Sequence, residues 1–169
     1  MRICLVRHAI AVERGTAGYD ELVQRPLTAQ GRQRMEAETP GLRELFSPQV
    51  IITSPLLRAR QTADILLAAY GLPKARISEA LASGDNTQLL SDLIDSEADA
   101  VMLVGHEPHM SATFSWLLTG DDERVTATFK KGGAALLTCD GEPRAGRCTL
   151  EWLIQPAALR AMKNQPSRD

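Results

Sequence analysis

The chain has 169 residues, of which 44% are hydrophobic and 24% charged, and this length suits one domain with a buried core. Its 19 Lys and Arg balance 21 Asp and Glu, for a formal net charge of -2. That balance does not suggest the clustered basic face of a nucleic-acid-binding protein. No apolar run is long enough to cross a bilayer, and the N-terminus lacks the cleavage site of a signal peptide. We therefore expect a cytoplasmic protein with neither nucleic-acid nor membrane partners.

Three short runs rich in Val, Ile and Leu predict buried strands at residues 3–6, 50–53 and 101–104, as in a parallel sheet covered on both faces. A first helix is expected from a Thr28 cap through residue 35, and Pro40-Gly41 should break or kink it before residues 42–46. A second is expected over residues 55–70, with Ser54 as cap and Gly71 as stop. A third should run from residue 110 to 118.

The last third of the chain has a different pattern. Residues 134–139 and 148–154 predict two strands that form a hairpin at a sheet edge, followed by a short helix at residues 157–162. We predict an α/β fold: a three-layer sandwich with a mostly parallel central sheet, helices on both faces and an antiparallel edge strand. One domain should span residues 1–163, and residues 164–169 should form a flexible tail.

The three cysteines, Cys4, Cys139 and Cys148, lie far apart and form no CxxC pair. An odd number without regular spacing argues against a disulfide framework and against a structural zinc site. We interpret Cys4 and Cys139, which sit in apolar runs, as small buried hydrophobic residues.

Polar residues of one kind follow each of the three buried strands. The first strand leads into Arg7 and His8, the second into a helix that carries Arg58 in its first turn, and the third into His106. The carboxyl ends of parallel strands meet at one edge of the sheet, which is where ligands of open α/β sheets bind. Each residue alone has an ordinary interpretation as a loop or surface side chain. Their arrival at one edge from three strands favours a common site.

Phosphate is the ligand that fits these side chains. An arginine presents a planar fork of donors that matches phosphate oxygens, and the N-terminus of the helix near Arg58 adds partial positive charge. We expect these charges to lower the pKa of His8, which leaves the neutral imidazole that a nucleophile needs. His106 is placed to donate to the oxygens that carry charge during phosphoryl transfer.

The same residues resemble the signature of the histidine phosphatase (phosphoglycerate mutase-like) superfamily. That signature is Arg-His-Gly after the first strand, Ser-Pro-x-x-Arg-x-x-x-Thr at a helix start, and a later Gly-His or Ser-His. The matching segments are residues 6–9 (VRHA), 54–62 (SPLLRARQT) and 104–106 (VGH), with 25–31 (RPLTAQG) similar to a further Pro-Leu-Thr-x-x-Gly motif.

The resemblance implies that His8 carries a phosphoenzyme intermediate, that Arg7, Arg58 and His106 complete the phosphate pocket, and that no metal or cofactor takes part. The short chain looks most like the SixA-type phosphohistidine phosphatases, which implies an open site and a phosphorylated side chain on another protein as substrate. Mutase activity is disfavoured because it generally needs a closed site. Nothing in the sequence demands an oligomer, and we expect a monomer.

Two departures from the family pattern bear on the chemistry. Ala9 stands where the family has Gly, which would fit poorly if the position required a positive φ. The general acid of larger members corresponds best to Glu79, with Asp85 second; a solvated loop carboxylate is an equally good interpretation of Glu79. Phosphohistidine needs an acid less than a phosphoester does, because imidazole leaves phosphorus more readily.

Three further residues have two interpretations each. Arg25 is either an exposed charge or part of the pocket rim, and Thr28 is either a helix cap or a phosphate contact. His109 is interpreted as a surface or pocket-rim residue rather than a metal ligand, because Pro108 between it and His106 makes metal binding on one helical face a poor fit.

The sequence thus predicts a phosphatase that acts through a phosphohistidine intermediate on phosphohistidine in a protein. The alternatives are a small-molecule phosphomonoesterase with Glu79 as acid, and a non-catalytic phosphate-binding module, which would not need a nucleophilic His8.

Overall fold

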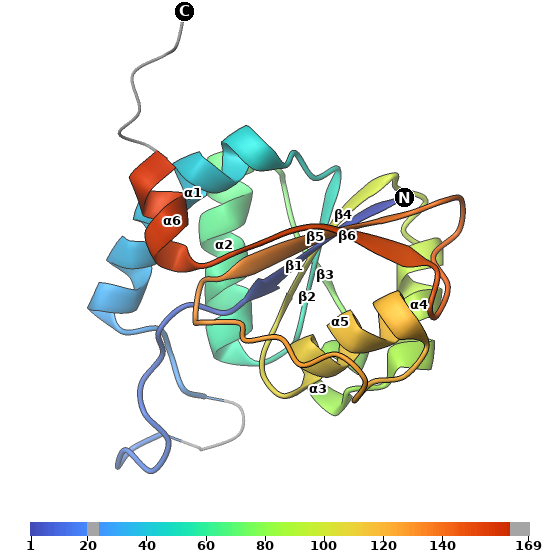
Figure 1. The fold of residues 1–169 in the computed structure, drawn as a ribbon. Coiled ribbons are helices and arrows are strands. Elements are labelled where there is room, and N and C mark those ends of the chain that lie inside the picture. The colour runs from blue at the N-terminus through green and yellow to red at the C-terminus, as the bar shows by residue number, and fades with distance from the viewer. Residues whose placement is uncertain (20–23, 163–169) are drawn as a thin grey trace, which may run out of the picture.

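The computed structural model describes residues 1–19 and 24–162, which form a six-stranded sheet between two groups of helices (Figure 1). The strand order is β3-β2-β4-β1-β5-β6. The strands are β1 (Arg2–Arg7), β2 (Val50–Thr53), β3 (Arg76–Ile77), β4 (Ala100–Gly105), β5 (Ala134–Cys139) and β6 (Cys148–Ile154). Neighbours from β3 to β1 are parallel, whereas β5 is antiparallel to β1 and β6 is antiparallel to β5. The predicted fold class is confirmed.

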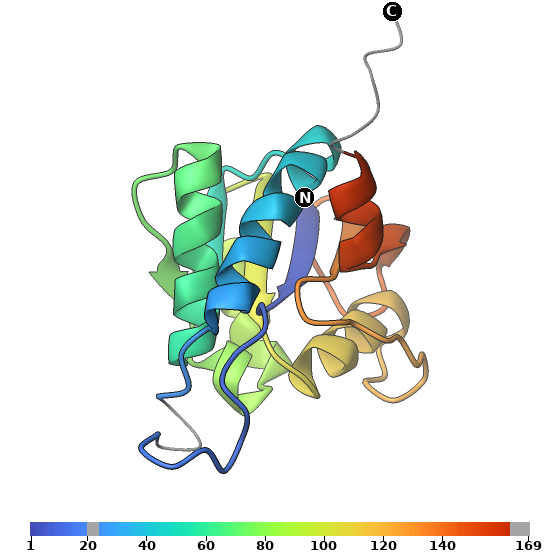
Figure 2. The ribbon, with the colours of Figure 1, turned by 90° about the vertical axis from the view of Figure 1, so that its left-hand side faces the viewer.

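The helices lie on both faces of this sheet. They are α1 (Ala29–Leu45), α2 (Leu57–Tyr70), α3 (Ala80–Ser83), α4 (Asn86–Ile94), α5 (His109–Thr119) and α6 (Pro156–Met162). In Figure 2, α1, α2 and α6 lie in front of the sheet, and α3, α4 and α5 pack on the opposite face. Cys4 and Val6 of β1 belong to the first of two apolar clusters, and Ile3 and Leu5 to the second. Alternate residues of a strand point to opposite faces, so a strand buried on both faces is apolar throughout.

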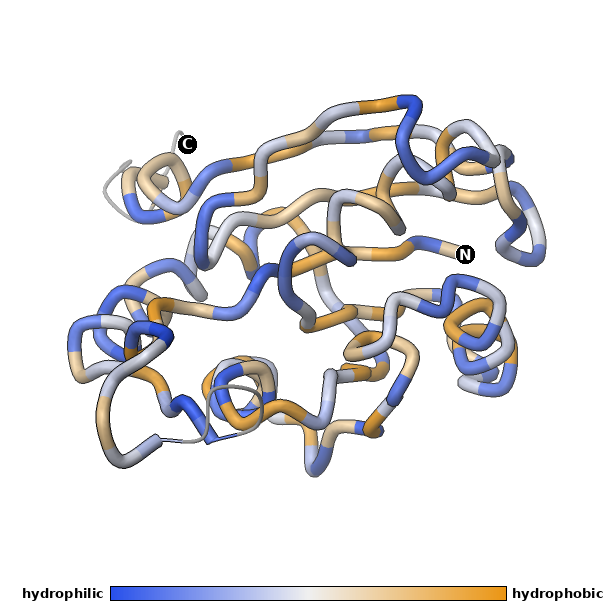
Figure 3. The backbone as a smooth tube through the Cα atoms, turned by 90° about the horizontal axis from the view of Figure 1, so that it is seen from below, coloured by the Kyte–Doolittle hydropathy of each residue, from blue (hydrophilic) through white to orange (hydrophobic). Residues whose placement is uncertain are grey.

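The carboxyl ends of the three predicted parallel strands meet at one edge. In the register of the sheet Arg7 is opposite Gly105, and Thr53 is opposite Val104. Figure 3 shows β1 running inward from the labelled N-terminus, hydrophobic for most of its length and hydrophilic at its far end. The sheet therefore brings together the polar residues that follow β1, β2 and β4.

Helix α1 is continuous from Ala29 to Leu45 and includes Pro40, so the predicted break before residue 42 is wrong. Proline has no N–H with which to reach the carbonyl four residues back. The Thr39 hydroxyl donates to that carbonyl, of Glu36, at 2.8 Å and so satisfies the acceptor that Pro40 leaves free. The predicted cap at the other end is confirmed, because Thr28 Oγ1 accepts a hydrogen bond from the Gly31 N–H at 2.9 Å.

Helix α2 begins at Leu57, with Leu56 as its N-cap and no side-chain cap. The expected start at Pro55 with a Ser54 cap is therefore wrong. The Ser54 N–H bonds to the Val104 carbonyl of β4, at 3.0 Å, so Ser54 is tied to the sheet just beyond the end of β2 and the helix starts later. The C-terminal prediction is confirmed, since Gly71 ends α2 with a left-handed φ of 68°.

The cysteines differ from the prediction. Cys139 and Cys148 form a disulfide across the β5–β6 hairpin, where the register makes them direct partners. Sequence spacing did not indicate this pairing because it depends on how residues 140–147 connect the two strands. Cys4 is a free, fully buried thiol in β1, as expected.

Several elements were not predicted, and one prediction falls outside the structure. The two-residue strand β3 and the helices α3 and α4 lie within residues 76–94. Leu89 and Leu93, four residues apart and buried on one face of α4, were a usable signal for that helix. The expected tail, residues 164–169, lies outside the described residues. No helix in the described ranges is both long and apolar enough to cross a membrane.

Gly41 provides a test of how α1 packs on α6. A Cβ at this position would lie 2.2 Å from the Leu159 carbonyl oxygen of α6. We expect Gly41→Ala to lower the free energy of unfolding by about 2–3 kcal/mol, since the backbones must separate. Gly141→Ala, with a φ of 74° and no neighbour within 4 Å, should cost about 1 kcal/mol from backbone strain alone. If urea denaturation finds Gly41→Ala neutral or stabilising, as helix propensity alone predicts, the close approach is contradicted.

Candidate active site

Two hydrogen bonds fix the orientation and the tautomer of His8. The ring Nδ1 lies 2.6 Å from the Ala9 carbonyl oxygen, which can only accept, so Nδ1 carries the proton. The opposite nitrogen, Nε2, accepts from Arg58 Nε at 3.2 Å. A neutral imidazole donates from one nitrogen and accepts at the other, and both conditions are met here. The Nε2 lone pair therefore faces Arg58.

The neutral state of His8 follows from its surroundings. Burial is the main cause that lowers its pKa, from 6.5 to about 3, and the charges of Arg58 and Arg7 lower it further. The bond to the Ala9 carbonyl acts in the opposite direction. The predicted direction is confirmed, although desolvation contributes more than the neighbouring charges on which the prediction rested. His8 is thus a neutral imidazole, with its Nε2 unprotonated, over the whole physiological pH range.

The backbone around His8 is held by the sheet and by α2. The His8 N–H donates to the Gly105 carbonyl at 2.9 Å. The Ala9 N–H donates at 3.0 Å to Thr62 Oγ1, and this hydroxyl donates at 2.7 Å to the Arg58 carbonyl. Thr62 thereby connects the two residues that bond to the His8 ring. The position of His8 relative to Arg58 is determined by main-chain contacts of two elements.

Ala9 fits the position where the resemblance has Gly. It is 3% exposed and belongs to the core cluster under α1 and α2. Among the described residues Glu97 is the one non-glycine residue with a positive φ, so Ala9 has an ordinary backbone conformation. The methyl group is accommodated without strain.

Arg7 and His106 approach the same pocket with buried donors. Arg7 Nε and His106 Nε2 are shielded from solvent and have no hydrogen-bond partner within residues 1–19 and 24–162. Buried polar atoms are normally paired, so unpaired ones point to a ligand that is polar itself. Burial and the charge of Arg58 lower the pKa of His106 from 6.5 to about 4. His106 is therefore also neutral near pH 7, and its ring bonds to the Glu107 backbone through the nitrogen other than Nε2. A phosphoryl dianion beside the ring favours its protonated form, in which Nε2 also donates.

These residues line a cavity of about 310 Å³ that opens at the sheet edge. The lining residues are Arg7, His8, Glu13, Arg14, Arg25, Arg58, His106, Glu107 and Lys131. Five of these side chains are cationic and two are carboxylates, which makes the pocket strongly positive although the whole chain is slightly negative. Such a pocket is complementary to a phosphoryl group, whose oxygens accept from guanidinium and imidazole donors.

Sequence reasoning missed four of the lining residues: Glu13, Arg14, Glu107 and Lys131. Glu107 follows His106 directly, and the Ser111 N–H donates to its carboxylate at 3.1 Å. The position of Glu107 after a strand was a usable signal. Glu13, Arg14 and Lys131 come from loops whose path no local pattern predicts.

The remaining candidates lie in different places. Arg25 lines the pocket, and its guanidinium donates to the Val12 carbonyl at 3.1 Å. Thr28 is not among the lining residues; its hydroxyl caps α1. Glu79 is exposed at the N-terminus of α3 and does not line the pocket. Asp85 accepts from the N–H groups of residues 87 and 88 as the cap of α4.

Metal binding has little structural basis in this region. Within the described ranges no group of three or more His, Cys, Asp or Glu side chains is arranged to hold a metal ion. His109 packs edge-on against His106, with ring centroids 5.3 Å apart. The pocket donors are instead mainly arginine and lysine, which do not ligate metals.

Comparison with known proteins agrees with the site geometry. The sequence profile of the histidine phosphatase superfamily (branch 1) matches residues 3–85. An uncharacterized protein from Picosynechococcus sp. is 42% identical over 115 residues, which is 65% of this chain and 68% of the relative. The chain belongs to the histidine phosphatase superfamily.

Solved structures extend the likeness over nearly the whole chain. The protein histidine phosphatase SixA in complex with tungstate is similar over 94% of this chain and 99% of its own, with a TM-score of 0.76 and 23% identity. A protein assigned as phosphohistidine phosphatase SixA of Agrobacterium tumefaciens matches over 92% and 98%, with a TM-score of 0.71 and 25% identity. The alpha-ribazole phosphatase of Shigella flexneri matches over 92% and 97%, with a TM-score of 0.75 and 17% identity. The chain is thus a phosphatase of this superfamily, and relatives of similar fold act on different substrates.

The lowered histidine pKa values predict how stability depends on pH. Below pH 6.5 the unfolded chain binds protons that folded His8 and His106, with pKa values of about 3 and about 4, do not. The two rings therefore do not lower the free energy of unfolding above pH 6.5, and they lower it progressively as the pH falls toward 4. Between pH 6.5 and 4.5 we expect the wild type to lose roughly 1–2 kcal/mol more of its free energy of unfolding than His8→Gln does. Parallel urea-denaturation profiles for the two proteins would contradict the neutral, buried His8.

Proposed function

We propose that the protein is a phosphohistidine phosphatase that removes the phosphoryl group from histidine side chains of another protein. The observation that carries the catalytic part is the His8 ring, whose Nδ1 is held by the Ala9 carbonyl while Nε2 faces Arg58. A module that only bound phosphate would need the arginines but not an unprotonated nitrogen directed at the ligand. In this proposal His8 is the nucleophile, and Arg7, Arg58 and His106 bind the phosphoryl oxygens.

The first step is transfer of the phosphoryl group to His8. Arg58 Nε transfers its hydrogen bond from Nε2 to a phosphoryl oxygen of the substrate, which frees the Nε2 lone pair. That lone pair forms a bond to phosphorus as the phosphorus–nitrogen bond of the substrate breaks, and the electron pair of the broken bond returns to the leaving imidazole. Arg58, Arg7 and His106 stabilise the charge on the equatorial oxygens. Because the other ring nitrogen of phosphohistidine carries a proton, the leaving imidazole departs neutral. The transfer therefore balances without a proton from the enzyme.

The second step returns the enzyme to its starting state. A water oxygen bonds to phosphorus, the bond between phosphorus and Nε2 breaks, and its electron pair returns to His8. Both hydrogens of the water end on the released phosphate. The proton remains on Nδ1 throughout, hydrogen-bonded to the Ala9 carbonyl, so His8 regains the tautomer with which it began.

Three observations support phosphohistidine, rather than a phosphoester, as the substrate. A phosphoester leaves as an alkoxide and needs an acid, yet Glu79, the predicted acid, does not line the cavity, and Glu107 is held by the Ser111 N–H. The open cavity can accept a side chain that projects from a protein surface. The likeness to the A. tumefaciens protein assigned as SixA, at 25% identity, supports the same substrate class. A small-molecule phosphomonoesterase with Glu79 as general acid is the alternative.

Turnover of two substrate classes separates these functions. We expect kcat/KM for a protein phosphorylated on histidine to exceed that for p-nitrophenyl phosphate and sugar phosphates by at least about 100-fold. His8→Ala should abolish both activities, with losses of at least about 1000-fold. Glu79→Gln should change phosphohistidine hydrolysis by less than about twofold and slow ester hydrolysis by less than His8→Ala does.

Glu44 is an exposed carboxylate on α1 that does not line the cavity, so Glu44→Gln is the matched control for Glu79→Gln. A wild-type preference for phosphomonoesters would overturn the proposed substrate class. An equally severe loss on phosphohistidine in Glu79→Gln would show that the leaving imidazole does require an acid.

A further inference from the structure

A second cavity, of about 560 Å³, adjoins the His8 pocket between α1, α6 and the loop that precedes β5. We refer to it as the α1–α6 groove. Arg7 and Lys131 line both cavities. A molecule whose phosphoryl group contacts His8 can therefore continue directly into the groove.

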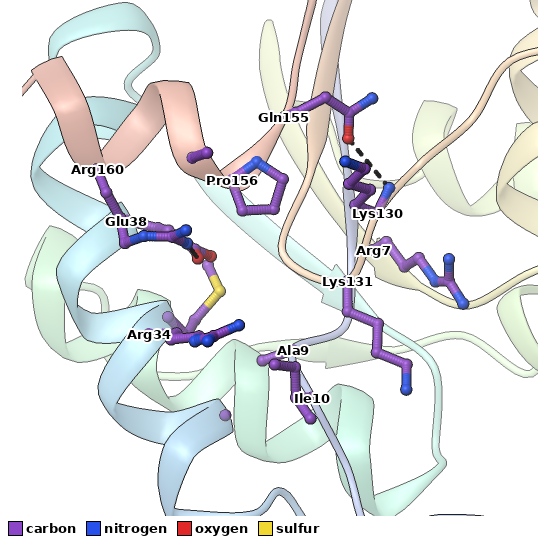
Figure 4. A pocket seen from close by; sticks show the side chains of 13 residues that line it. Arg7, Ala9, Ile10, Arg34, Glu38, Lys130, Lys131, Gln155, Pro156 and Arg160 are labelled. Carbon is purple, nitrogen blue, oxygen red and sulfur yellow. Dashed lines mark hydrogen bonds and ion pairs between the residues drawn. The ribbon is translucent and has the colours of Figure 1, made fainter.

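The groove is bordered by positive charge from both sides. Arg34 lies on the α1 side, and Lys130 and Lys131 lie on the loop opposite, as Figure 4 shows. These three side chains are exposed and make no hydrogen bond or ion pair within the described residues. The one carboxylate of the lining, Glu38, is 2% exposed and paired with Arg160. The charge of Arg34 also acts on Glu38, where it opposes the rise in pKa that burial causes. Because Glu38 is the one carboxylate among the described residues that line the groove, the groove keeps an excess of positive charge.

The surface between these charges is apolar. Ala9 and Ile10 lie between Arg34 and Lys131 in Figure 4, and Pro156 of α6 lies above them. Met35, fully buried, also contributes to the lining. An apolar floor with cationic edges suits a ligand that carries apolar and anionic groups together.

We propose that the α1–α6 groove docks an acidic segment of the phosphorylated protein, which binds beside the phosphohistidine. This inference rests on the proposed function and adds the chemistry of the partner. Acidic side chains of the segment pair with Arg34, Lys130 and Lys131, and an apolar side chain covers Ile10 and Pro156. The groove exceeds the size of a phosphate group and has an apolar floor, which favours a peptide segment over the second phosphate of a small metabolite. Complementary charge also steers the encounter of the two proteins.

Binding of two matched peptides tests this assignment. Each carries a phosphonotriazole, a stable analogue of phosphohistidine, with a Leu and two flanking residues that are Glu in one peptide and Gln in the other. Fluorescence anisotropy measures their Kd for the wild type and for Arg34→Glu/Lys130→Glu. Arg32→Glu/Lys74→Glu makes the same charge change at exposed positions outside both cavities. Arg34→Gln/Lys130→Gln avoids placing a new carboxylate near Glu38.

We expect the wild type and the Arg32→Glu/Lys74→Glu control to bind the Glu peptide about tenfold more tightly than the Gln peptide at low salt. The Arg34→Glu/Lys130→Glu variant should reverse this preference, and the Gln double variant should remove most of it. Equal binding of the two peptides by the wild type, or a preference retained in Arg34→Glu/Lys130→Glu, would overturn the proposal.

A small-molecule role gives a different result. Equal peptide affinities, together with weaker binding of a sugar bisphosphate to Arg34→Glu/Lys130→Glu, would assign the groove to a metabolite and overturn the protein partner. Failure of the proposed function is separate, since it would appear as no hydrolysis of authentic phosphohistidine while the preference for the Glu peptide persists.

Discussion

The chemistry proposed for this protein depends on the hydrogen bond from His8 Nδ1 to the carbonyl of Ala9. That bond places the single proton of the neutral ring on the side away from the pocket. Arg58 then donates to the other nitrogen instead of competing with a proton there. Burial makes the arrangement stable, because a second proton would put a charge in a desolvated site beside two guanidinium groups. The neutral ring at neutral pH is what the proposed nucleophilic role of His8 requires.

The fold holds this arrangement through main-chain contacts. β1 and β4 place Arg7 and Gly105 side by side, so His8 and His106 leave the sheet at the same edge. Thr62 connects the Ala9 N–H to the Arg58 carbonyl and couples α2 to the loop after β1. The groups proposed to bind the phosphoryl oxygens are therefore held in place by the fold itself, as electrostatic catalysis requires. The adjoining α1–α6 groove shares Arg7 and Lys131 with the pocket and extends the same positive surface.

Sequence reasoning succeeded where the physics is local. The apolar runs located β1, β2 and β4, both strands of the hairpin were placed at residues 134–139 and 148–154, and His8, Arg58 and His106 were expected at one edge. It failed where distant contacts decide. The Ser54 N–H bonds to Val104 of β4, which delays the start of α2, and the hairpin register pairs Cys139 with Cys148. Pro40 is a local exception, because the Thr39 hydroxyl satisfies the Glu36 carbonyl that Pro40 leaves free. The loops that carry Glu13, Arg14 and Lys131 into the pocket have no periodic signal at all.

The site of phosphorylation is the most direct test of the central claim. Rapid alkaline quenching of the enzyme during turnover of a histidine-phosphorylated protein, followed by mass spectrometry and ³¹P NMR, identifies both the residue and the ring nitrogen. We predict an acid-labile, base-stable phosphate on His8, bonded to Nε2, because the Ala9 carbonyl holds the proton on Nδ1. Phosphate on Nδ1 of His8, on another residue, or undiminished labelling of His8→Ala would contradict the account.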